Sequence, residues 1–567
     1  MTTTYDAFVD AFHRYFTTDP NACLRLGVQK NLDRLPDPSV EALEAHASQG
    51  RALLAQLDDL ERDGLDFDRD LDLDLARLHL ESELHLKTCP MGDRGQLERM
   101  PTAGKDIGEG VFTLLIHDPR PAGERLSDIT ARLEQVPDYL EALQGRLTRP
   151  LQRWVAMDIQ KVDGLPSLLD TIEAWAVEEQ WADTERLRRA RSQAQEAMAA
   201  YTQALAAREV SHDLHIGDAM TRRTVKLRGI DLSVEELHGI ATRFLADTRA
   251  VIEELRQTLV GRYGLASDAS VEELQVHLAQ RYRSVKPGEP LERVLDRYRA
   301  EEASLQTFMD ARQLFPIPDA QEMTILQTPE FMAPSIPAGA MMPPPAFRPG
   351  VARSLIYLTL SEELLDEHTE LTIPAMMIHE GIPGHHLQLA SAARHPSVIR
   401  RHLDSMDMAE GWTTMLEDYM LDVGYLGELT DEARFCGKRD ISRLAARVAI
   451  DLFFMSGDRD LLDIGMPCDL SPKDPFKAAG NLLRAVTGFV PGRVEAELNW
   501  YSQERGYPLS YLTGNHLIWA LKSEVAQASA DKGLDLDRQF HRLYLESGNM
   551  PLTFLRRVFV HRGLLPS

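Results

Sequence analysis

Hydrophobic residues recur at helical spacing through most of residues 1 to 313. The segment Ser233–Glu236 has the Ser-x-x-Glu pattern of a capping box, and Ser270–Glu273 repeats this pattern. The first box precedes an apolar stripe, which comprises Leu237, Ile240, Ala241, Phe244, Val251 and Leu255. Such stripes predict amphipathic helices that bury one face, and nothing in them indicates a cofactor. We therefore expect a mainly α fold.

The pattern changes near residue 315. The stretch from Thr328 to Arg353 is predicted to be a loop that lines a site, because its prolines exclude a helix or a central strand; these are Pro329, Pro334, Pro337, Pro343, Pro344, Pro345 and Pro349. The next segment, 354–360 (SLIYLTL), is predicted to be a strand. It is either an exposed edge that pairs with an extended peptide or a purely structural strand.

The change divides the chain into a helical half, 1–315, and a catalytic half, 316–567. A chain of 567 residues is long enough for two domains or for one large body. We expect one compact, mainly helical unit with a deep central cleft and a small β element.

Composition narrows the class of partner. The formal charge of -26 repels phosphate backbones and anionic lipids, so neither nucleic acid nor a membrane is expected to bind. No stretch is apolar enough to span a bilayer, and the first thirty residues do not resemble an export signal. The four cysteines are far apart and form no CxxC pair, which favours free thiols in a reducing cytoplasm. A homodimer is compatible with the sequence.

The segment 379–386 (HEGIPGHH) places three histidines and a glutamate around a helix-breaking pair. In many zinc peptidases two histidines at i and i+4 of one helix bind the metal. Here position i+4 is Pro383, and on an unbroken helix His379 and His385 would differ by about 240° and about 9 Å. Pro383 removes a helical hydrogen bond and Gly384 tolerates the dihedral angles of a kink, so we predict a bent helix.

The kink swings His385 toward His379, and we prefer His385 as the second metal ligand. His386 shares a helical face with His379 but lies about 10.5 Å along the axis, and it stays open as an alternative. The helix is predicted to begin at Pro374, a favoured first-turn residue. Glu380 adjoins His379 and is the candidate general base for amide hydrolysis.

A catalytic zinc ion needs a third protein ligand and an open position for water. Glu410 is the preferred candidate, because it lies in the apolar segment 408–418, where an unpaired carboxylate would be costly. Glu417, two turns further on the same face, is either an alternative ligand or an acceptor for a ligand imidazole. Two histidines and one glutamate favour Zn²⁺.

Two further groups are needed for peptide hydrolysis. The oxyanion requires a donor, and Tyr511 is the best candidate, with His516, Tyr501 and Arg493 as weaker ones. A carboxypeptidase also needs a cation for the substrate carboxylate. Four basic residues could supply it without one standing out, namely Arg493, Arg439, Arg447 and Lys438.

Three segments together resemble the bacterial domain of unknown function 885 family: HEGIPGHHLQ at 379–388, EGW at 410–412 and SYLTG at 510–514. The family is similar to thermostable zinc carboxypeptidases, and the resemblance covers nearly the whole chain. It implies a mostly helical body with a cleft. It also implies that His379, His385 and Glu410 bind zinc, that Glu380 is the base, and that His385 is the ligand rather than His386.

Three positions depart from the family pattern. Trp500-Tyr501 and Gly506-Tyr507 replace an expected Arg-Tyr pair and Gly-Gln step, and Met455 stands where relatives tend to have a histidine. The segment 338–342 also lacks the paired tyrosines associated with the proline-rich loop. The surroundings of the metal shell are therefore altered, and specificity is expected to differ.

The leading hypothesis is a cytoplasmic zinc-dependent metallopeptidase that hydrolyses short peptides, with carboxypeptidase action as the narrower form. The alternatives are a zinc hydrolase of a non-peptide amide or another small molecule, and a zinc-binding protein without turnover.

Overall fold

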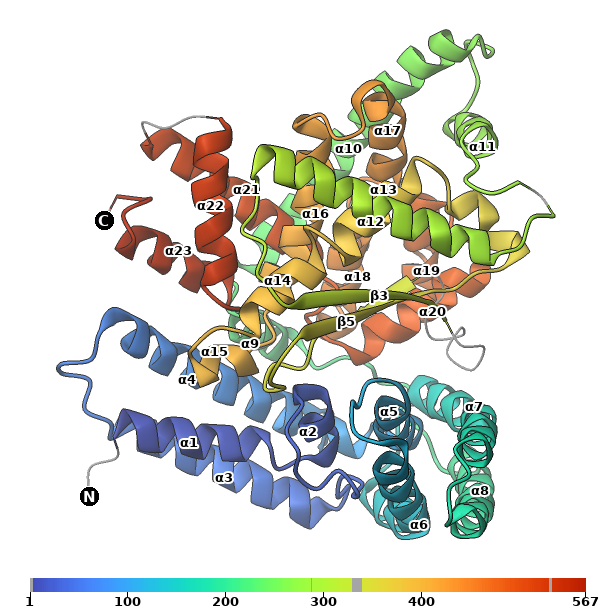
Figure 1. The fold of residues 1–567 in the computed structure, drawn as a ribbon, viewed down its shortest axis with the longest axis vertical. Coiled ribbons are helices and arrows are strands. Elements are labelled where there is room, and N and C mark those ends of the chain that lie inside the picture. The colour runs from blue at the N-terminus through green and yellow to red at the C-terminus, as the bar shows by residue number, and fades with distance from the viewer. Residues whose placement is uncertain (1–3, 287, 329–338, 530–532, 567) are drawn as a thin grey trace. The chain divides into compact units, whose positions relative to one another are not determined.

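The computed structural model describes residues 4–286, 288–328, 339–529 and 533–566. These residues form a mainly α protein with two small sheets, which confirms the predicted fold class at that level (Figure 1). Pro329, Pro334, Pro337 and Ala338 of the predicted loop lie outside the described residues.

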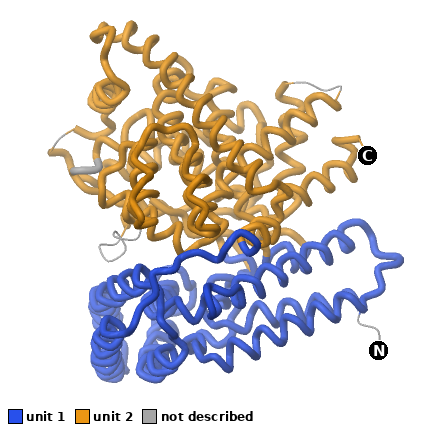
Figure 2. Tube along the Cα trace, turned by 180° about the vertical axis from the view of Figure 1, so that it is seen from behind, with its two compact units in different colours: residues 1–220, 345–348, 397–402 blue, residues 221–344, 349–396, 403–567 orange. Residues whose placement is uncertain are grey.

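Contacts divide the chain into two compact units (Figure 2). Unit 1 comprises residues 1–220, 345–348 and 397–402, and unit 2 comprises 221–344, 349–396 and 403–567. The composition change near residue 315 does not coincide with this division; it marks the end of a helix and the start of the strands within unit 2.

Unit 1 is built from helices and one hairpin whose two strands have two residues each. Segment 397–402 belongs to it because Arg400 is buried there, donating from Nε to Asp72 Oδ1 at 2.6 Å and from Nη2 to Asp68 Oδ1 at 2.9 Å. Its elements are α1 (Tyr5–Phe16), α2 (Pro20–Leu26), α3 (Val40–Asp58), α4 (Phe67–Thr88), β1 (Pro90–Met91), β2 (Arg94–Gly95), η1 (Gln96–Glu98), α5 (Ala103–Ile116), α6 (Ala122–Arg146), α7 (Gln152–Glu178), α8 (Thr184–Ala206) and α15 (Val398–His402).

Unit 2 begins within α9 (Asp218–Leu227) and carries the predicted site. Its other elements are α10 (Val234–Tyr263), α11 (Val271–Arg281), α12 (Glu292–Arg312), β3 (Gln321–Gln327), β4 (Gly339–Met342), β5 (Ala352–Leu358), η2 (Glu362–Glu367), α13 (Thr372–Glu380), α14 (His385–Ala392), α16 (Met406–Asp422), η3 (Gly427–Leu429), α17 (Thr430–Ile441), α18 (Arg443–Ser456), η4 (Arg459–Leu462), α19 (Pro475–Thr487), α20 (Pro491–Gln503), α21 (Ser510–Ala528), α22 (Leu534–Glu546) and α23 (Leu552–His561).

Local sequence signals place several of these helices correctly. Both predicted capping boxes form, at Ser233 with Glu236 and at Ser270 with Glu273. The α10 stripe is buried at Leu237, Ile240 and Ala241, and burial then continues one position later than predicted, at Leu245 and Ile252. The core face therefore turns slightly around the helix along its length.

Of the two alternatives for segment 354–360, the structure has the purely structural strand, and the exposed edge is wrong. Strand β5 is the middle strand of the sheet, parallel to β3 and antiparallel to β4. Its residues 354–358 are buried, so β5 has no free edge for a peptide. The continuous apolar run reflects burial on both faces, which is typical of a central strand. The edges of this sheet are β3 and β4, and β4 forms within the proline-rich stretch.

Two sequence-level exclusions can be compared with the structure. All four cysteines are free thiols, as predicted. Among the described residues, no helix combines the length and the apolar character that crossing a bilayer requires.

Candidate metal centre

The predicted bend lies between α13 and α14. Helix α13 begins at Thr372, two residues before the predicted start, and ends at Glu380; α14 begins at His385. Gly384 has φ -76° and ψ -134°, a combination outside the helical and extended regions. A Cβ at Gly384 would also lie 2.0 Å from the carbonyl oxygen of His379. Glycine is needed here because the chain turns back tightly against the end of α13.

Helix α16 holds this turn in place. Trp412 is fully buried, and its Nε1 donates to the Pro383 carbonyl oxygen at 2.8 Å. Its ring stacks on Tyr544 with centroids 4.6 Å apart. The same helix carries Glu410, so the tryptophan of the EGW motif ties the turn that presents the histidines to the helix that presents the carboxylate.

His379, His385 and Glu410 converge on one point. One ligand atom from each lies within 4.8 Å of the others. Glu410 Oε2 is 3.2 Å from His385 Nε2 and 3.6 Å from His379 Nε2. The two imidazole rings meet at 83° with centroids 4.9 Å apart, so both can direct a nitrogen at a common atom. This group could hold a metal ion.

The polar atoms of the group fit a cation. Glu410 is 3% exposed, and its Oε2 has no hydrogen bond of normal geometry with a described residue. A buried carboxylate oxygen without a donor is costly, and a cation between it and the imidazoles would supply the partner. Burial opposes ionisation, yet the charge of His385 and contacts with both histidines leave the pKa of Glu410 well below its usual range. The carboxylate is thus charged and ready to bind.

Glu417 contacts the opposite nitrogen of His379. His379 Nδ1 donates to Glu417 Oε1 at 2.7 Å, which leaves Nε2 directed at the candidate metal position. Burial alone would lower the pKa of His379, but Glu410 and Glu417 raise it to about 10 in the metal-free protein. Two roles were open for Glu417, and this geometry favours the role of acceptor for a ligand imidazole.

His386 is turned away from this group. Its ring is fully buried and hydrogen-bonded to Ser354 of β5, with Nδ1 2.7 Å from Oγ, and to Gln321 of β3. Burial lowers the pKa of His386 to about 4, so it is a neutral ring that links α14 to the sheet. His386 is therefore not part of the His379, His385 and Glu410 group, because the bend directs adjacent side chains to opposite faces.

Two tyrosines lie beside Glu410. Tyr507 donates to Glu410 Oε1 at 2.9 Å, and its ring stacks on Tyr511 with centroids 5.8 Å apart. Burial, and then the charge of Glu410, raise the pKa of both phenols well above the usual range, so both remain neutral donors. In the sequence, Tyr507 stands out only as a departure from the family pattern. Its spacing of one helical turn from Tyr511 could have identified it.

Two glycines allow α16 and α21 to approach closely. A Cβ at Gly411 would lie 2.5 Å from the carbonyl carbon of Gly514, and a Cβ at Gly514 would lie 2.0 Å from the Asp407 carbonyl oxygen. Gly411 follows Glu410, and Gly514 lies three residues after Tyr511. The close crossing thus brings the tyrosines of one helix end to the carboxylate of the other.

Of the remaining predicted residues, only Glu380 adjoins one of the three ligands among the described residues. Glu380 ends α13 beside His379, and no described residue hydrogen-bonds to its carboxylate. Tyr501 is fully buried, and its hydroxyl accepts from Arg447 Nε and donates to Glu497 Oε2. His516 is exposed, and the charged group near it is Arg243 of α10.

Arg493 lies 3.6 Å from Glu367, and its guanidinium lies over the ring of Phe489. Within the part of the chain that the structure describes, it does not contact His379, His385 or Glu410. Met455, noted for replacing a histidine, is fully buried in α18.

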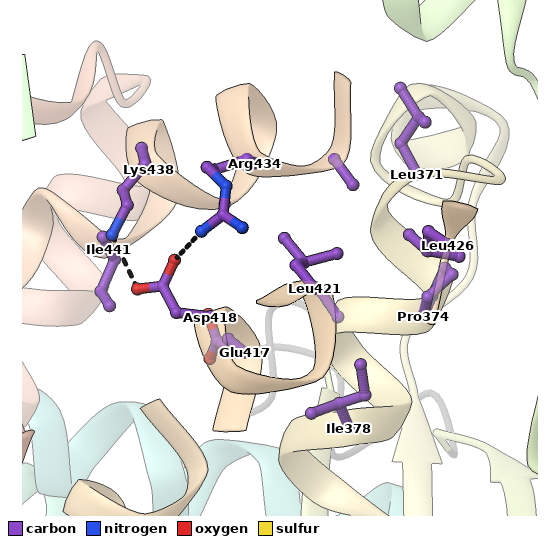
Figure 3. Close-up of a pocket in the computed structure, with 13 residues that line it drawn as sticks. Leu371, Pro374, Ile378, Glu417, Asp418, Leu421, Leu426, Arg434, Lys438 and Ile441 are labelled. Atoms are coloured by element: carbon purple, nitrogen blue, oxygen red, sulfur yellow. Dashed lines mark hydrogen bonds and ion pairs between the residues drawn. The ribbon is translucent and has the colours of Figure 1, made fainter. Parts of the chain in front are cut away.

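A small hollow lies behind Glu417, between α13, α16 and α17 (Figure 3). Its walls are largely apolar, including Leu371, Ile378 and Leu421, and Asp418 at its rim pairs with Arg434 and Lys438. It has room for little more than a water molecule. The hollow therefore adjoins the Nδ1 side of His379 and is too small for a peptide.

Comparisons with known proteins agree with this fold. No curated protein matches the chain. A candidate lipoprotein of unknown function from Shewanella oneidensis has a similar structure, with a TM-score of 0.76 and 18% identity over 98% of this chain and 99% of the other. A candidate lipoprotein from Colwellia psychrerythraea gives a TM-score of 0.78 and 16% identity over 99% of both chains.

At such identities the two structures support the fold alone. The sequence comparison goes further, because the match to one family extends over almost the whole chain. Residues 20–559 match the family described as bacterial protein of unknown function (DUF885), and the chain belongs to that family.

Proposed function

We propose that this protein is a zinc-dependent hydrolase that cleaves peptide bonds of short peptides. The observation that carries the proposal is the convergence of His379, His385 and Glu410. At its centre lies a buried oxygen of Glu410 that accepts no hydrogen bond from the described residues. Two imidazoles and one carboxylate are the ligand set of several catalytic zinc sites. The family's similarity to thermostable zinc carboxypeptidases supports the same class.

The residues around the centre suit amide hydrolysis. A bound zinc ion supplies Lewis acidity, which acidifies water and polarises a carbonyl group. Glu380 follows the ligand His379 directly and has no hydrogen-bond partner among the described residues, so it can accept a proton from water and return it to the leaving amine. Tyr511 and Tyr507 are neutral phenols beside Glu410 and can donate to the oxyanion.

A hydrolase of a non-peptide amide is the second candidate. Trp500, Tyr507 and Tyr511 form a group of aromatic rings next to Glu410, with Trp500 5.0 Å from Tyr507 between centroids. Such a surface suits a flat apolar substituent as well as a peptide side chain. A zinc-binding protein without turnover remains the third alternative, and the experiment below separates all three.

The cellular location is also a proposal. Free cysteines favour the cytoplasm, whereas the two similar structures are described as candidate lipoproteins. We retain the cytoplasm, and fractionation of the source cells with an antibody against the protein tests it. Recovery with the envelope would contradict this location without affecting the hydrolase proposal.

The experiment is hydrolysis by zinc-loaded protein of short peptides, blocked peptides and aryl amides, beside Glu380→Gln. We expect cleavage of peptides and a loss of about 100-fold or more in Glu380→Gln with zinc content unchanged. Cleavage of aryl amides alone favours the second candidate. Equal rates for both proteins on every substrate contradict the hydrolase proposal.

A further inference from the structure

Four basic residues could bind a substrate carboxylate on sequence grounds, and the structure separates them. Lys438 pairs with Asp418 at 2.7 Å on the Nδ1 side of His379, opposite the metal position. Arg439 faces Glu272 at 3.8 Å, and Arg493 faces Glu367. None of these three contacts the residues around Glu410 within the part of the chain that the structure describes.

Arg447 on α18 is different. Its guanidinium carbon lies 4.4 Å from the centroid of the Tyr511 ring and 5.1 Å from that of Trp500. Tyr511 in turn stacks on Tyr507, which donates to Glu410 Oε1 at 2.9 Å. The stacked rings of Tyr511 and Tyr507 thus lie between Arg447 and the candidate metal ligand, a separation suited to the end of a substrate whose scissile bond lies at the metal.

The guanidinium is held rigidly and keeps one donor group available. Nε donates to the Tyr501 hydroxyl at 3.0 Å, and Nη2 donates to Glu497 Oε2 at 3.0 Å. Nη1 has no hydrogen-bond acceptor among the described residues. It is not fully enclosed, so it retains contact with solvent. An arginine with two nitrogens anchored is preorganised to bind an anion with the third.

We propose that Arg447 binds the free α-carboxylate of the substrate and thereby makes the protein a carboxypeptidase. This inference rests on the proposed hydrolase function and names its substrate class, peptides with an unblocked C-terminus. Tyr501 and Glu497 act as positioning residues, because they fix the guanidinium rather than contact the substrate. The rings of Trp500 and Tyr511 cover part of the guanidinium, and the weaker solvent screening beside them strengthens the ion pair with the substrate.

The test uses pairs of N-acetylated dipeptides that differ only in a C-terminal carboxylate or carboxamide. For the zinc-loaded protein we expect kcat/KM to be higher for the carboxylate. In Arg447→Met the carboxylate substrate should lose about 10- to 100-fold, mostly through KM, while the carboxamide changes little. The ratio of the two substrates is measured on the same sample, so loss of folded protein does not affect it.

Three variants complete the design. Arg447→Lys should retain part of the preference, because it keeps the charge but loses the fixed geometry. Arg447→Met with Glu497→Gln removes both charges of the pair and should lose the preference as Arg447→Met does. Arg439→Met, a matched cation of the neighbouring helix, should leave the preference intact. Equal losses on carboxylate and carboxamide, or no preference in the unaltered protein, would overturn the proposal.

Failure of the hydrolase function has a separate outcome. If the zinc-loaded protein cleaves neither substrate, calorimetric titration with the same two N-acetylated dipeptides measures binding alone. Tighter binding of the carboxylate, lost in Arg447→Met, supports the carboxylate site. Equal binding of both by the unaltered protein contradicts it.

Discussion

Both units contain a group of histidines, and the two groups differ in what surrounds the rings. In unit 2, His379 contacts Glu410 and Glu417, and its pKa rises to about 10. In unit 1, His402 contacts Phe12 and Phe347, with centroids 5.7 and 4.6 Å away, and burial lowers its pKa to about 2. Carboxylates thus prepare one group for a cation, while aromatic rings keep the other neutral.

The unit 1 group illustrates how little histidine proximity alone means. His13 Nδ1 lies 2.9 Å from His402 Nε2, and the His79 ring is tilted against Phe16 with centroids 4.4 Å apart. Three histidines therefore gather without a carboxylate ligand close to His402 among the described residues, and no candidate metal group is found there. A negative ligand is what distinguishes the two groups, since it offsets the cation's charge in a buried place.

The largest expected effect is on metal content. In His379→Ala, zinc measured by elemental analysis should fall from about one ion per chain to near zero, because the two remaining ligands cannot complete the shell. His402→Leu should keep its zinc. Equal zinc in His379→Ala and the unaltered protein would show that the ligand assignment is wrong.

The next effect concerns Glu417, which acts through His379. Glu417→Gln should weaken zinc binding by about 10- to 100-fold, since the amide orients the imidazole less well than a carboxylate. Competition with a chromogenic chelator measures the change. Asp418→Asn is the matched control, because this neighbouring acid pairs with Lys438 and Arg434 rather than with a ligand. An equal loss in both variants would argue for a general charge effect.

The third effect is expected from a substitution that shifts helix α16 and with it the Glu410 carboxylate. In Gly514→Ala the new methyl group collides with the Asp407 backbone, so α16 and α21 must separate. We expect a loss of about 1–3 kcal/mol in the free energy of unfolding by urea, together with weaker zinc binding. Gly261→Ala on α10 has open space around it and should instead stabilise the protein by about 0.5–1 kcal/mol. Wild-type stability in Gly514→Ala would contradict the role of the close crossing.

These comparisons show what the sequence could predict. The bend at Pro383, the approach of His385 to His379 and the capping boxes at Ser233 and Ser270 depend on neighbours in the sequence. Local stereochemistry governs such features, so spacing and residue type suffice.

Other features depend on partners far along the chain. The parallel pairing of β3 with β5 makes β5 central, and no pattern within residues 354–360 reveals it. Tyr507 reaches Glu410 across 97 positions, and His13 meets His402 across 389. Tertiary packing decides these contacts, which is why the aromatic group of unit 1 and the bridge from Glu410 to Arg447 were not predicted.

The smallest expected effect is the pH dependence of unit 1. The unfolded chain binds a proton at His402 near pH 6.5, whereas the folded chain binds it only near pH 2, because burial, then the nearby His79 and His13, disfavour the charge. The contribution of His402 to stability is therefore complete above about pH 6.5 and is lost progressively as the pH falls toward 2. In His402→Leu the urea unfolding midpoint should fall less between pH 7.5 and 4.5 than in the unaltered protein. His212→Leu replaces an exposed histidine of the same unit and should keep the original slope. If all three proteins show the same slope, the aromatic surroundings do not hold His402 neutral, and the contrast with the carboxylate-lined group of unit 2 is lost.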